Sequence, residues 1–280
     1  MHDTIKETPM RSWTALRIRA IALTIALPLT TIAADDPVKQ RLETSPRHNE
    51  WVKVKSGERT VQVFVAYPQA KEKATTVLVI HENRGLTDWV RSLADQLAEA
   101  GYVAVAPDLL SGAGPGGGKT SDFPSQDAAV QAIYKLAADQ VTADLDAVAD
   151  YAVKLPASNG RLAVAGYCWG GGQSFRFATH RGDLKGAFVF YGPPPEKPED
   201  LAKIGCPVYG FYGGNDGRIG ATVAGTTDAM KAAGKTYEPV TYEGAGHGFM
   251  RLGEDGTGTD ADRKGRDAAW ERWREILKGI

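Results

Sequence analysis

Cysteine is scarce in this sequence, and neither sign of charge dominates it. Only two cysteines occur among 280 residues, no C-x-x-C pair is present, and 33 Lys and Arg residues stand against 34 Asp and Glu residues. The missing C-x-x-C pair argues against a thiol redox protein. The balanced charge gives no reason to expect nucleic acid or an acidic lipid surface as a partner.

Long apolar runs are also rare, and one of them lies near the N-terminus. Three arginines precede an apolar run over residues 20–32, which ends in Ala33 and Ala34 before two aspartates. A basic start, a short apolar middle and small residues are typical of a secretory signal peptide. A membrane anchor is the alternative, but this run is too short to cross about 30 Å of hydrocarbon comfortably. We therefore expect a cleaved signal over 1–34, a flexible segment over 35–47 and a secreted or periplasmic protein.

The rest of the chain alternates between strand-like and helix-like segments. Residues 50–68 alternate apolar and polar side chains around a central Ser-Gly, which predicts an antiparallel hairpin. Short apolar runs separated by helical spacing predict a mostly parallel central sheet with helices on both faces, an α/β fold in one domain over 48–280. The expected strands are 75–82, 102–110, 160–168, 185–192, 206–214 and 236–247, and the expected helices are 86–101, 128–155, 171–180 and 262–280.

The two cysteines fall at opposite ends of the expected strands. Cys168 follows the C-terminal end of one strand, and Cys206 begins the next but one. These positions lie at opposite edges of a parallel sheet, much farther apart than the ~7 Å between Cα atoms that a disulfide tolerates. We therefore predict two free thiols.

A glycine-rich stretch, "AGPGGGKT" at residues 113–120, is similar to a phosphate-binding loop. Such a loop works because its amides lie at the N-terminus of a helix that follows at once. Here Pro124 and several turn residues intervene, so we interpret the stretch as a flexible loop.

The stretch "AGYCWGGG" at residues 165–172 has the spacing of a nucleophile elbow with cysteine in place of serine, and no G-x-S-x-G motif competes with it. A free cysteine is often a small buried hydrophobe, which is the alternative for Cys168. A strand-to-helix turn would instead expose the thiol, favour its thiolate at the helix N-terminus and aim the Trp169 amide at an oxyanion.

A nucleophilic thiol needs a base, and the chain has five histidines. His247, in a glycine-flanked loop after the last strand, is the best placed, and His81 at the end of an earlier strand is its rival. Asp216 follows the strand between elbow and His247 and could fix the imidazole tautomer, although it could also be a simple turn residue. The order nucleophile, acid, histidine is that of the α/β hydrolases.

With these residues in hand, the chain resembles the dienelactone hydrolase family of the α/β-hydrolase superfamily from about residue 50 onward. The resemblance rests on "HENRG", "GYCWGG", "GGNDGRI" and "GHGFMR". It implies the α/β-hydrolase fold and a catalytic triad of Cys168, Asp216 and His247. It also implies that Glu82 holds the resting thiol by a hydrogen bond and takes part in its deprotonation when substrate arrives.

The resemblance further implies that backbone amides of Asn83 and Trp169 form the oxyanion hole and that Arg251 grips a substrate carboxylate. Glu82 could instead pair with Arg84, and Arg251 could be a solvated loop residue. The family's second carboxylate-binding arginine has no counterpart in the 110–125 loop, which offers only Lys119, so the substrate stays open.

The expected function is that of an exported hydrolase that cleaves a lactone or small carboxylic ester through a cysteine acyl-enzyme. The alternatives are a general cysteine carboxylesterase for acylated sugars or aromatic esters, and a non-catalytic binding protein on the same fold. We expect no metal or cofactor, a small-molecule partner, no membrane contact after signal cleavage, and a monomer or small homo-oligomer.

Overall fold

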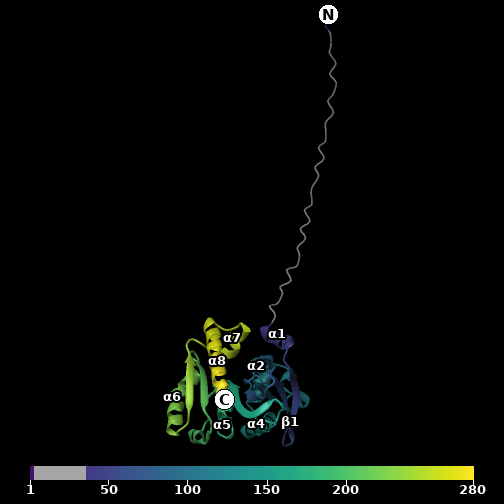
Figure 1. Ribbon diagram of the computed structural model, residues 1–280. Helices are drawn as coiled ribbons and strands as arrows, with labels where there is room; N and C mark the ends of the chain where they lie inside the picture. Colours follow the sequence, from purple (N-terminus) through teal and green to yellow (C-terminus); the bar gives the residue numbers. More distant parts are fainter. Residues whose placement is uncertain (3–35) are drawn as a thin grey trace. The chain divides into compact units, whose positions relative to one another are not determined.

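The computed structural model describes residues 1–2 and 36–280, and the signal expected over 1–34 lies almost wholly outside the described residues. The described chain forms an eight-stranded sheet with the order β1-β2-β4-β3-β5-β6-β7-β8 (Figure 1). The strands are β1 Asn49–Ser56, β2 Arg59–Ala66, β3 Ala74–Ile80, β4 Val103–Asp108, β5 Ser158–Tyr167, β6 Gly186–Phe190, β7 Val208–Gly213 and β8 Tyr237–Tyr242.

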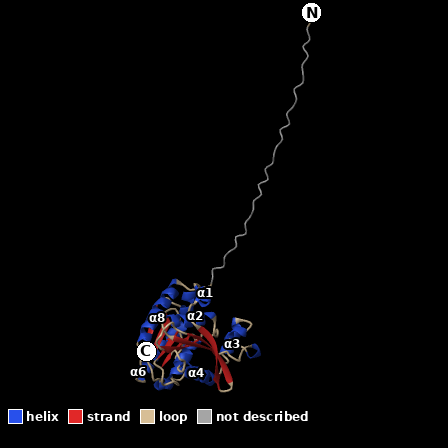
Figure 2. Ribbon diagram, turned by 45° about the vertical axis from the view of Figure 1, so that its right-hand side comes forward, coloured by secondary structure: helices blue, strands red, loops and turns tan. Residues whose placement is uncertain are grey.

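Helices cover both faces of this sheet (Figure 2). One core contains apolar side chains of α4, α5 and α6, and the other contains those of α1, α2, α7 and α8. The helices are α1 Pro37–Thr44, α2 Asp88–Glu99, α3 Gln126–Ile133, α4 Ala138–Ala152, α5 Trp169–Ala178, α6 Gly217–Ala232, α7 Phe249–Asp255 and α8 Asp260–Lys278. The predicted mostly parallel sheet with helices on both faces is confirmed.

The strand pairing follows from the sequence pattern. The alternating segment forms the antiparallel β1–β2 hairpin, and β2 also pairs antiparallel with β4. The strands from β3 onward pair parallel to one another. The apolar strands β3, β4, β6 and β7 are buried almost throughout, whereas β8 at the edge of the sheet is largely exposed. The C-terminal ends of β3, β5, β7 and β8 therefore meet along one edge of the sheet, where ligands of open α/β sheets bind.

One expected helix is divided. The sequence pattern predicted a continuous helix over 128–155, but the chain turns between α3 and α4 at residues 134–137. Ala129 and Ile133 of α3 pack on Leu110, whereas Val141 and Leu145 of α4 pack on the main core. Because the two apolar faces meet different parts of the domain, one straight helix could not bury both.

The segment 35–47, expected to be flexible, contains α1. Asp36 caps this helix by accepting a hydrogen bond from the Val38 amide, and Val38 is buried. Beyond the helix, the guanidinium of Arg47 donates to both carboxylate oxygens of the fully buried Asp95 on α2 at 2.9 and 2.6 Å. A buried ion pair thus fixes a segment whose composition indicated mobility.

Both cysteines of the described chain are free, as predicted. Cys206 is buried before β7, and burial raises the pKa of its thiol to about 11. The glycine-rich 113–120 stretch forms only short 3-10 turns, Pro115–Gly117 and Thr120–Asp122, so no helix N-terminus follows it.

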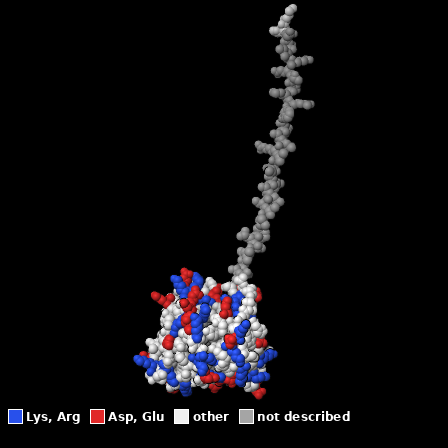
Figure 3. Space-filling model, viewed as in Figure 1, with Lys and Arg blue, Asp and Glu red and all other residues white. Residues whose placement is uncertain are grey.

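Basic and acidic side chains are interspersed over the face of the domain shown in Figure 3, in keeping with the balanced composition. Among the described helices, none combines the length and apolar character needed to span a bilayer.

Candidate active site

Cys168 lies on a sharp turn between β5 and α5. Its backbone has φ of 56° and ψ of −116°, a conformation that costs a non-glycine residue about 1–3 kcal/mol. A Cβ atom on Gly166 would overlap the carbonyl oxygen of Gly170, and one on Gly170 would overlap that of His81. The G-x-C-x-G spacing therefore lets three backbone segments meet closely enough to hold the thiol in this strained position.

The thiol contacts the imidazole of His247. Cys168 Sγ lies 3.1 Å from His247 Nε2, and His247 Nδ1 lies 2.5 Å from Asp216 Oδ2. Burial lowers the pKa of His247, but the hydrogen bonds to Cys168 and Asp216 outweigh this effect and raise that pKa to about 9. A protonated imidazole between a sulfur and a carboxylate is the arrangement that stabilises a thiolate.

Asp216 follows β7 and caps α6. Its Oδ1 accepts a hydrogen bond from the Ile219 amide at 3.3 Å, which leaves Oδ2 directed at His247. The side chain is 6% exposed. Because the helix cap fixes the carboxylate, Asp216 is more than a turn residue, and it holds the His247 ring with Nε2 facing the sulfur.

The rival base His81 belongs to the core. It is fully buried, its Nδ1 donates to the Glu82 carbonyl at 2.7 Å and its Nε2 accepts from the Leu109 amide at 3.3 Å. Burial lowers the pKa of His81, which favours its neutral form. Both ring nitrogens are occupied by backbone groups, so His81 orders the backbone around Glu82.

Glu82 departs from the expectation that it holds the resting thiol. Its Oε2 accepts a hydrogen bond from Arg251 Nε at 2.9 Å, and its Oε1 lies 3.4 Å from the hydroxyl of Tyr191. In the described chain the hydrogen-bond partner of the Cys168 thiol is His247 instead. The ion pair with Arg251, rather than one with Arg84, compensates the buried charge of Glu82.

Arg251 is likewise held in place and is no solvated loop residue. It lies on α7, where its side chain is 17% exposed, and it also pairs with Asp255 at 3.2 Å. Burial lowers the pKa of Arg251, and the neighbouring Glu82 more than reverses that shift. A substrate carboxylate at Arg251 would have to compete with two protein carboxylates.

The two backbone amides expected to form the oxyanion hole have no acceptor within the described chain. Asn83 N follows β3, and Trp169 N is the first amide of α5; neither appears among the described backbone or side-chain hydrogen bonds. The free amide at the start of α5 lies directly after the nucleophile, where the α/β-hydrolase elbow places one oxyanion donor.

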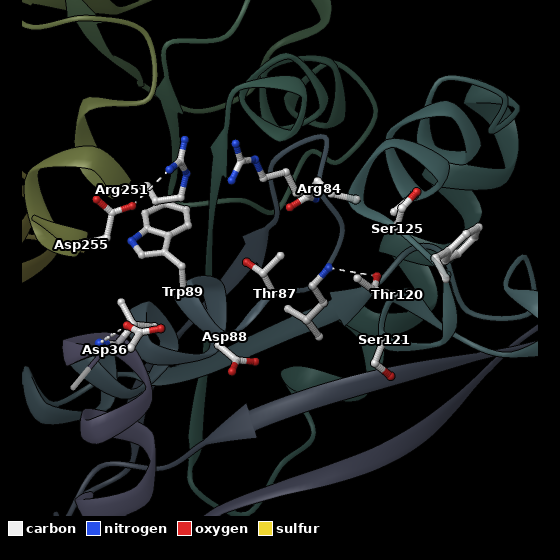
Figure 4. Close-up of a pocket in the computed structure, with 15 residues that line it drawn as sticks. Asp36, Arg84, Thr87, Asp88, Trp89, Thr120, Ser121, Ser125, Arg251 and Asp255 are labelled. Carbon is white, nitrogen blue, oxygen red and sulfur yellow. Dashed lines mark hydrogen bonds and ion pairs between the residues drawn. The ribbon is translucent and has the colours of Figure 1, made fainter. Parts of the chain in front are cut away.

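Two hollows adjoin these residues. The first, of about 480 Å³, contains Cys168 and Trp169 in its wall and runs along α5. The second, also about 480 Å³, is lined by Arg251, Asp255 and Arg84. In Figure 4, Arg84 and Arg251 extend their guanidinium groups toward the same end of this second hollow.

Sequence reasoning missed Tyr191 and Asp255. Tyr191 follows β6 with φ of 40°, is fully buried, and packs the edge of its ring on His247 with centroids 5.1 Å apart. Burial raises the pKa of Tyr191, as does the neighbouring Glu82. A tyrosine before "GPPP" carries no motif, and the only available signal was its place after a buried strand.

Comparison with known proteins shows to which family the chain is similar. Residues 61–280 match the model of the dienelactone hydrolase family. A Salmonella typhimurium protein named "Putative carboxymethylenebutenolidase" is 34% identical over 66% of this chain and 72% of its own, and the Pseudomonas putida carboxymethylenebutenolidase is 31% identical over 67% and 80%. The structure of a "Putative Dienelactone Hydrolase" from Klebsiella pneumoniae superimposes with a TM-score of 0.73 at 26% identity, covering 84% of this chain and 99% of that one.

These matches confirm the expected α/β-hydrolase fold and extend over nearly all of the described domain. The range matched by the family model includes the four segments on which the sequence resemblance rested. The chain belongs to the dienelactone hydrolase family.

Proposed function

We propose that this protein hydrolyses a small carboxylic ester or lactone through a covalent thioester on Cys168. The observation that carries the proposal is the continuous relay from Cys168 Sγ through His247 to Asp216, with contacts of 3.1 and 2.5 Å. A nucleophile within reach of a base, which a third group orients, is the arrangement that covalent catalysis requires.

Acylation begins with the thiolate of Cys168 and the imidazolium of His247. The sulfur attacks the ester carbonyl, and the amides of Asn83 and Trp169 donate to the oxyanion that forms. Collapse of this intermediate breaks the bond to the leaving oxygen, which takes the proton from His247 Nε2. The alcohol leaves, or stays tethered when the substrate is a lactone, and a thioester remains on Cys168.

Deacylation uses the same residues in reverse. Neutral His247 removes a proton from water, the hydroxide attacks the thioester, and the second intermediate expels the thiolate as the acid product leaves. Asp216 keeps Nε2 directed at the reacting atoms in both halves. The raised pKa of His247, about 9, keeps the proton on the imidazole while the thiolate is free.

Glu82 and Arg251 supply a second element of the proposal. A substrate carboxylate that draws Arg251 away would free Glu82, which then becomes a second proton acceptor, besides His247, in molecules whose Cys168 is still a thiol. Arg84 lines the same hollow as Arg251 and could share the substrate carboxylate with it. This role supports acid-bearing lactones as substrates, and it predicts that neutral esters depend less on Arg251.

The test is hydrolysis of trans- and cis-dienelactone and of p-nitrophenyl acetate by the wild type, Cys168→Ala and Cys206→Ala. Cys206 is a matched control because it is the other free thiol and lies buried away from the elbow. We expect Cys168→Ala to lose at least ~10³-fold in kcat/KM and Cys206→Ala to keep its activity. Cleavage that survives in Cys168→Ala contradicts the mechanism.

Two substrate patterns separate the related hypotheses. Lactone opening supports a lactonase, and cleavage of p-nitrophenyl acetate alone supports a cysteine carboxylesterase. Alkylation of Cys168 by iodoacetamide without turnover of any ester would instead support a binding protein.

We also propose that the domain acts outside the cytoplasm, on the strength of the apolar run over 20–32 and its flanking residues. N-terminal sequencing of the protein from cell fractions tests this. A new terminus after Ala33 or Ala34 in the periplasm or medium is expected, and an intact N-terminus in the cytoplasm contradicts it.

A further inference from the structure

The hollow that contains Cys168 is longer than a small lactone needs. Its wall follows one face of α5 through Trp169, Gly172, Gln173 and Arg176 and reaches His180 just beyond the helix. Residues spaced by three and four lie on one helical face. Trp169 and Arg176 are seven steps apart on the helix, about 10 Å along its axis.

A proline run next to α5 forms another part of the wall. Pro193, Pro194 and Pro195 line the hollow, and Pro193 lies close against Gly172 of α5, where a Cβ would come within 3.1 Å of it. Proline fixes the backbone φ and has no amide hydrogen. This wall is therefore stiff and apolar, and it suits the methylene chain or ring of a substrate better than its polar end.

Positive charge gathers in the wall of the same hollow. Arg176, Lys197 and Arg218 line it, and so do the carboxylates Glu196 and Asp200. Asp200 forms an ion pair of 2.6 Å with Lys203. Within the described chain, Lys197 and Arg218 form no ion pair.

The third cation, Arg176, is half-buried, and its hydrogen-bond partners are neutral. Arg176 donates to the Ala138 carbonyl, to Thr142 Oγ1 at 2.7 Å and to Gln173 Oε1 at 3.2 Å. Burial lowers the pKa of Arg176, and the charge of nearby Asp139 opposes this only in part. A half-buried guanidinium without a carboxylate in its hydrogen bonds leaves its positive charge available to a ligand in the hollow.

We propose, on the basis of the proposed esterase function, that this hollow binds the anionic far end of an elongated ester. The reacting carbonyl lies at Cys168, and an apolar or aromatic segment lies along α5 and the proline run. A carboxylate or phosphate group lies among Arg176, Lys197 and Arg218. The preferred substrates are therefore esters with a negative charge many bonds from the reacting carbonyl.

This anion site is distinct from Arg251. The guanidinium of Arg251 already binds Glu82 and Asp255, and it lines the other hollow. A ligand anion at Lys197 and Arg218 displaces no protein carboxylate, so its binding carries no such cost.

The test compares three p-nitrophenyl esters. Two have acyl chains of equal length and differ in terminal charge, and the third has a shorter charged chain. The mono-p-nitrophenyl ester of suberic acid carries a distant carboxylate, p-nitrophenyl octanoate is its neutral match, and the monoester of succinic acid carries a near carboxylate. We expect wild-type kcat/KM to favour the suberate ester over the octanoate at least tenfold. In Lys197→Ala/Arg218→Ala that ratio should fall to about one, mainly through KM.

Lys231→Ala is the matched control, because it removes a positive charge from the last turn of α6 outside the hollow. It should keep the wild-type ratio. The proposal is overturned if Lys197→Ala/Arg218→Ala keeps the wild-type ratio of kcat/KM between the suberate and octanoate esters. It is also overturned if only Arg251→Met loses that ratio, because the anion then lies elsewhere. A preference for the succinate ester over the suberate ester would also overturn it.

A binding measurement separates this inference from the proposed function. In the calorimetric experiment, monomethyl suberate is titrated into the Cys168→Ala variant, and hexyl phosphate is titrated into it separately. Comparison of the two affinities shows whether the site prefers a carboxylate or a phosphate. Binding that weakens at least tenfold when Lys197→Ala and Arg218→Ala are added supports the anion site even if no ester is cleaved. Ester cleavage without binding of either anion refutes the site and leaves the hydrolase intact.

Discussion

Arg251 on α7 and Glu82 after β3 form an ion pair of 2.9 Å across 169 residues of sequence. The Glu82 side chain is 6% exposed, so its charge depends on this partner. Arg251 therefore ties α7 to the edge of the central sheet, at the end of β3.

Removal of the arginine should destabilise the domain. Arg251→Met leaves a buried carboxylate without its cation, and we expect the free energy of unfolding to fall by about 2–4 kcal/mol in urea titrations. Glu82→Gln/Arg251→Met should recover most of that loss, because no buried charge remains. Arg263→Met, which breaks the exposed pair with Asp260, should change stability by less than about 1 kcal/mol. Equal losses in both arginine variants would show that Glu82 does not depend on Arg251.

The protonation of His247 should make stability depend on pH above neutrality. Its pKa is about 9 in the folded chain against an ordinary value of 6.5, so proton binding favours the folded state. This contribution is complete below about pH 6.5 and is lost as pH rises through 9. The stability difference between wild type and His247→Gln should therefore shrink over that range in urea titrations repeated at several pH values. A difference that stays constant would contradict the raised pKa.

Asp216→Asn should reduce catalysis without unfolding the protein. The amide can still cap α6 through its oxygen, but it no longer stabilises the imidazolium or fixes the ring tautomer. We expect kcat for p-nitrophenyl acetate to fall by about 10²–10⁴-fold. In imidazole NMR titrations, the pKa of His247 should be raised less in this variant than in the wild type. Unchanged kcat would remove Asp216 from the mechanism.

Two glycine substitutions should have opposite effects. Gly166→Ala places a Cβ against the Gly170 carbonyl, so we expect loss of the elbow geometry and destabilisation of several kcal/mol. Gly225→Ala lies within α6 with no atom near its Cβ position, and it should raise stability by about 0.5–1 kcal/mol. Thermal unfolding and p-nitrophenyl acetate hydrolysis measure both. A tolerated Gly166→Ala would show that the elbow can move.

The relay could be predicted from sequence because each member carries a local signal. Cys168 is flanked by glycines at fixed offsets, Asp216 ends an apolar strand, and His247 lies between glycines after the last strand. Parallel strands place such strand ends along one edge, so the fold class and the meeting of these residues followed from the same pattern.

The pairing of charges could not be predicted in this way. Glu82 has Arg84 two residues away in sequence, but the structure pairs it with Arg251, because α7 carries that guanidinium over the edge of the sheet. Arg47 and Asp95 are 48 residues apart, and their ion pair holds the segment after α1 against α2. Such contacts depend on tertiary positions that no local pattern specifies.

The two free thiols of the described chain differ so strongly in environment that a thiol reagent can count the active sites of the native protein. Cys206 is buried and its thiol pKa is raised to about 11, whereas Cys168 lines an open hollow beside an imidazolium. A chromogenic disulfide reagent should therefore release close to one equivalent of dye rapidly from each folded molecule and a second only after unfolding. The rapid equivalent would titrate competent sites in any preparation, without mutation or labelled substrate.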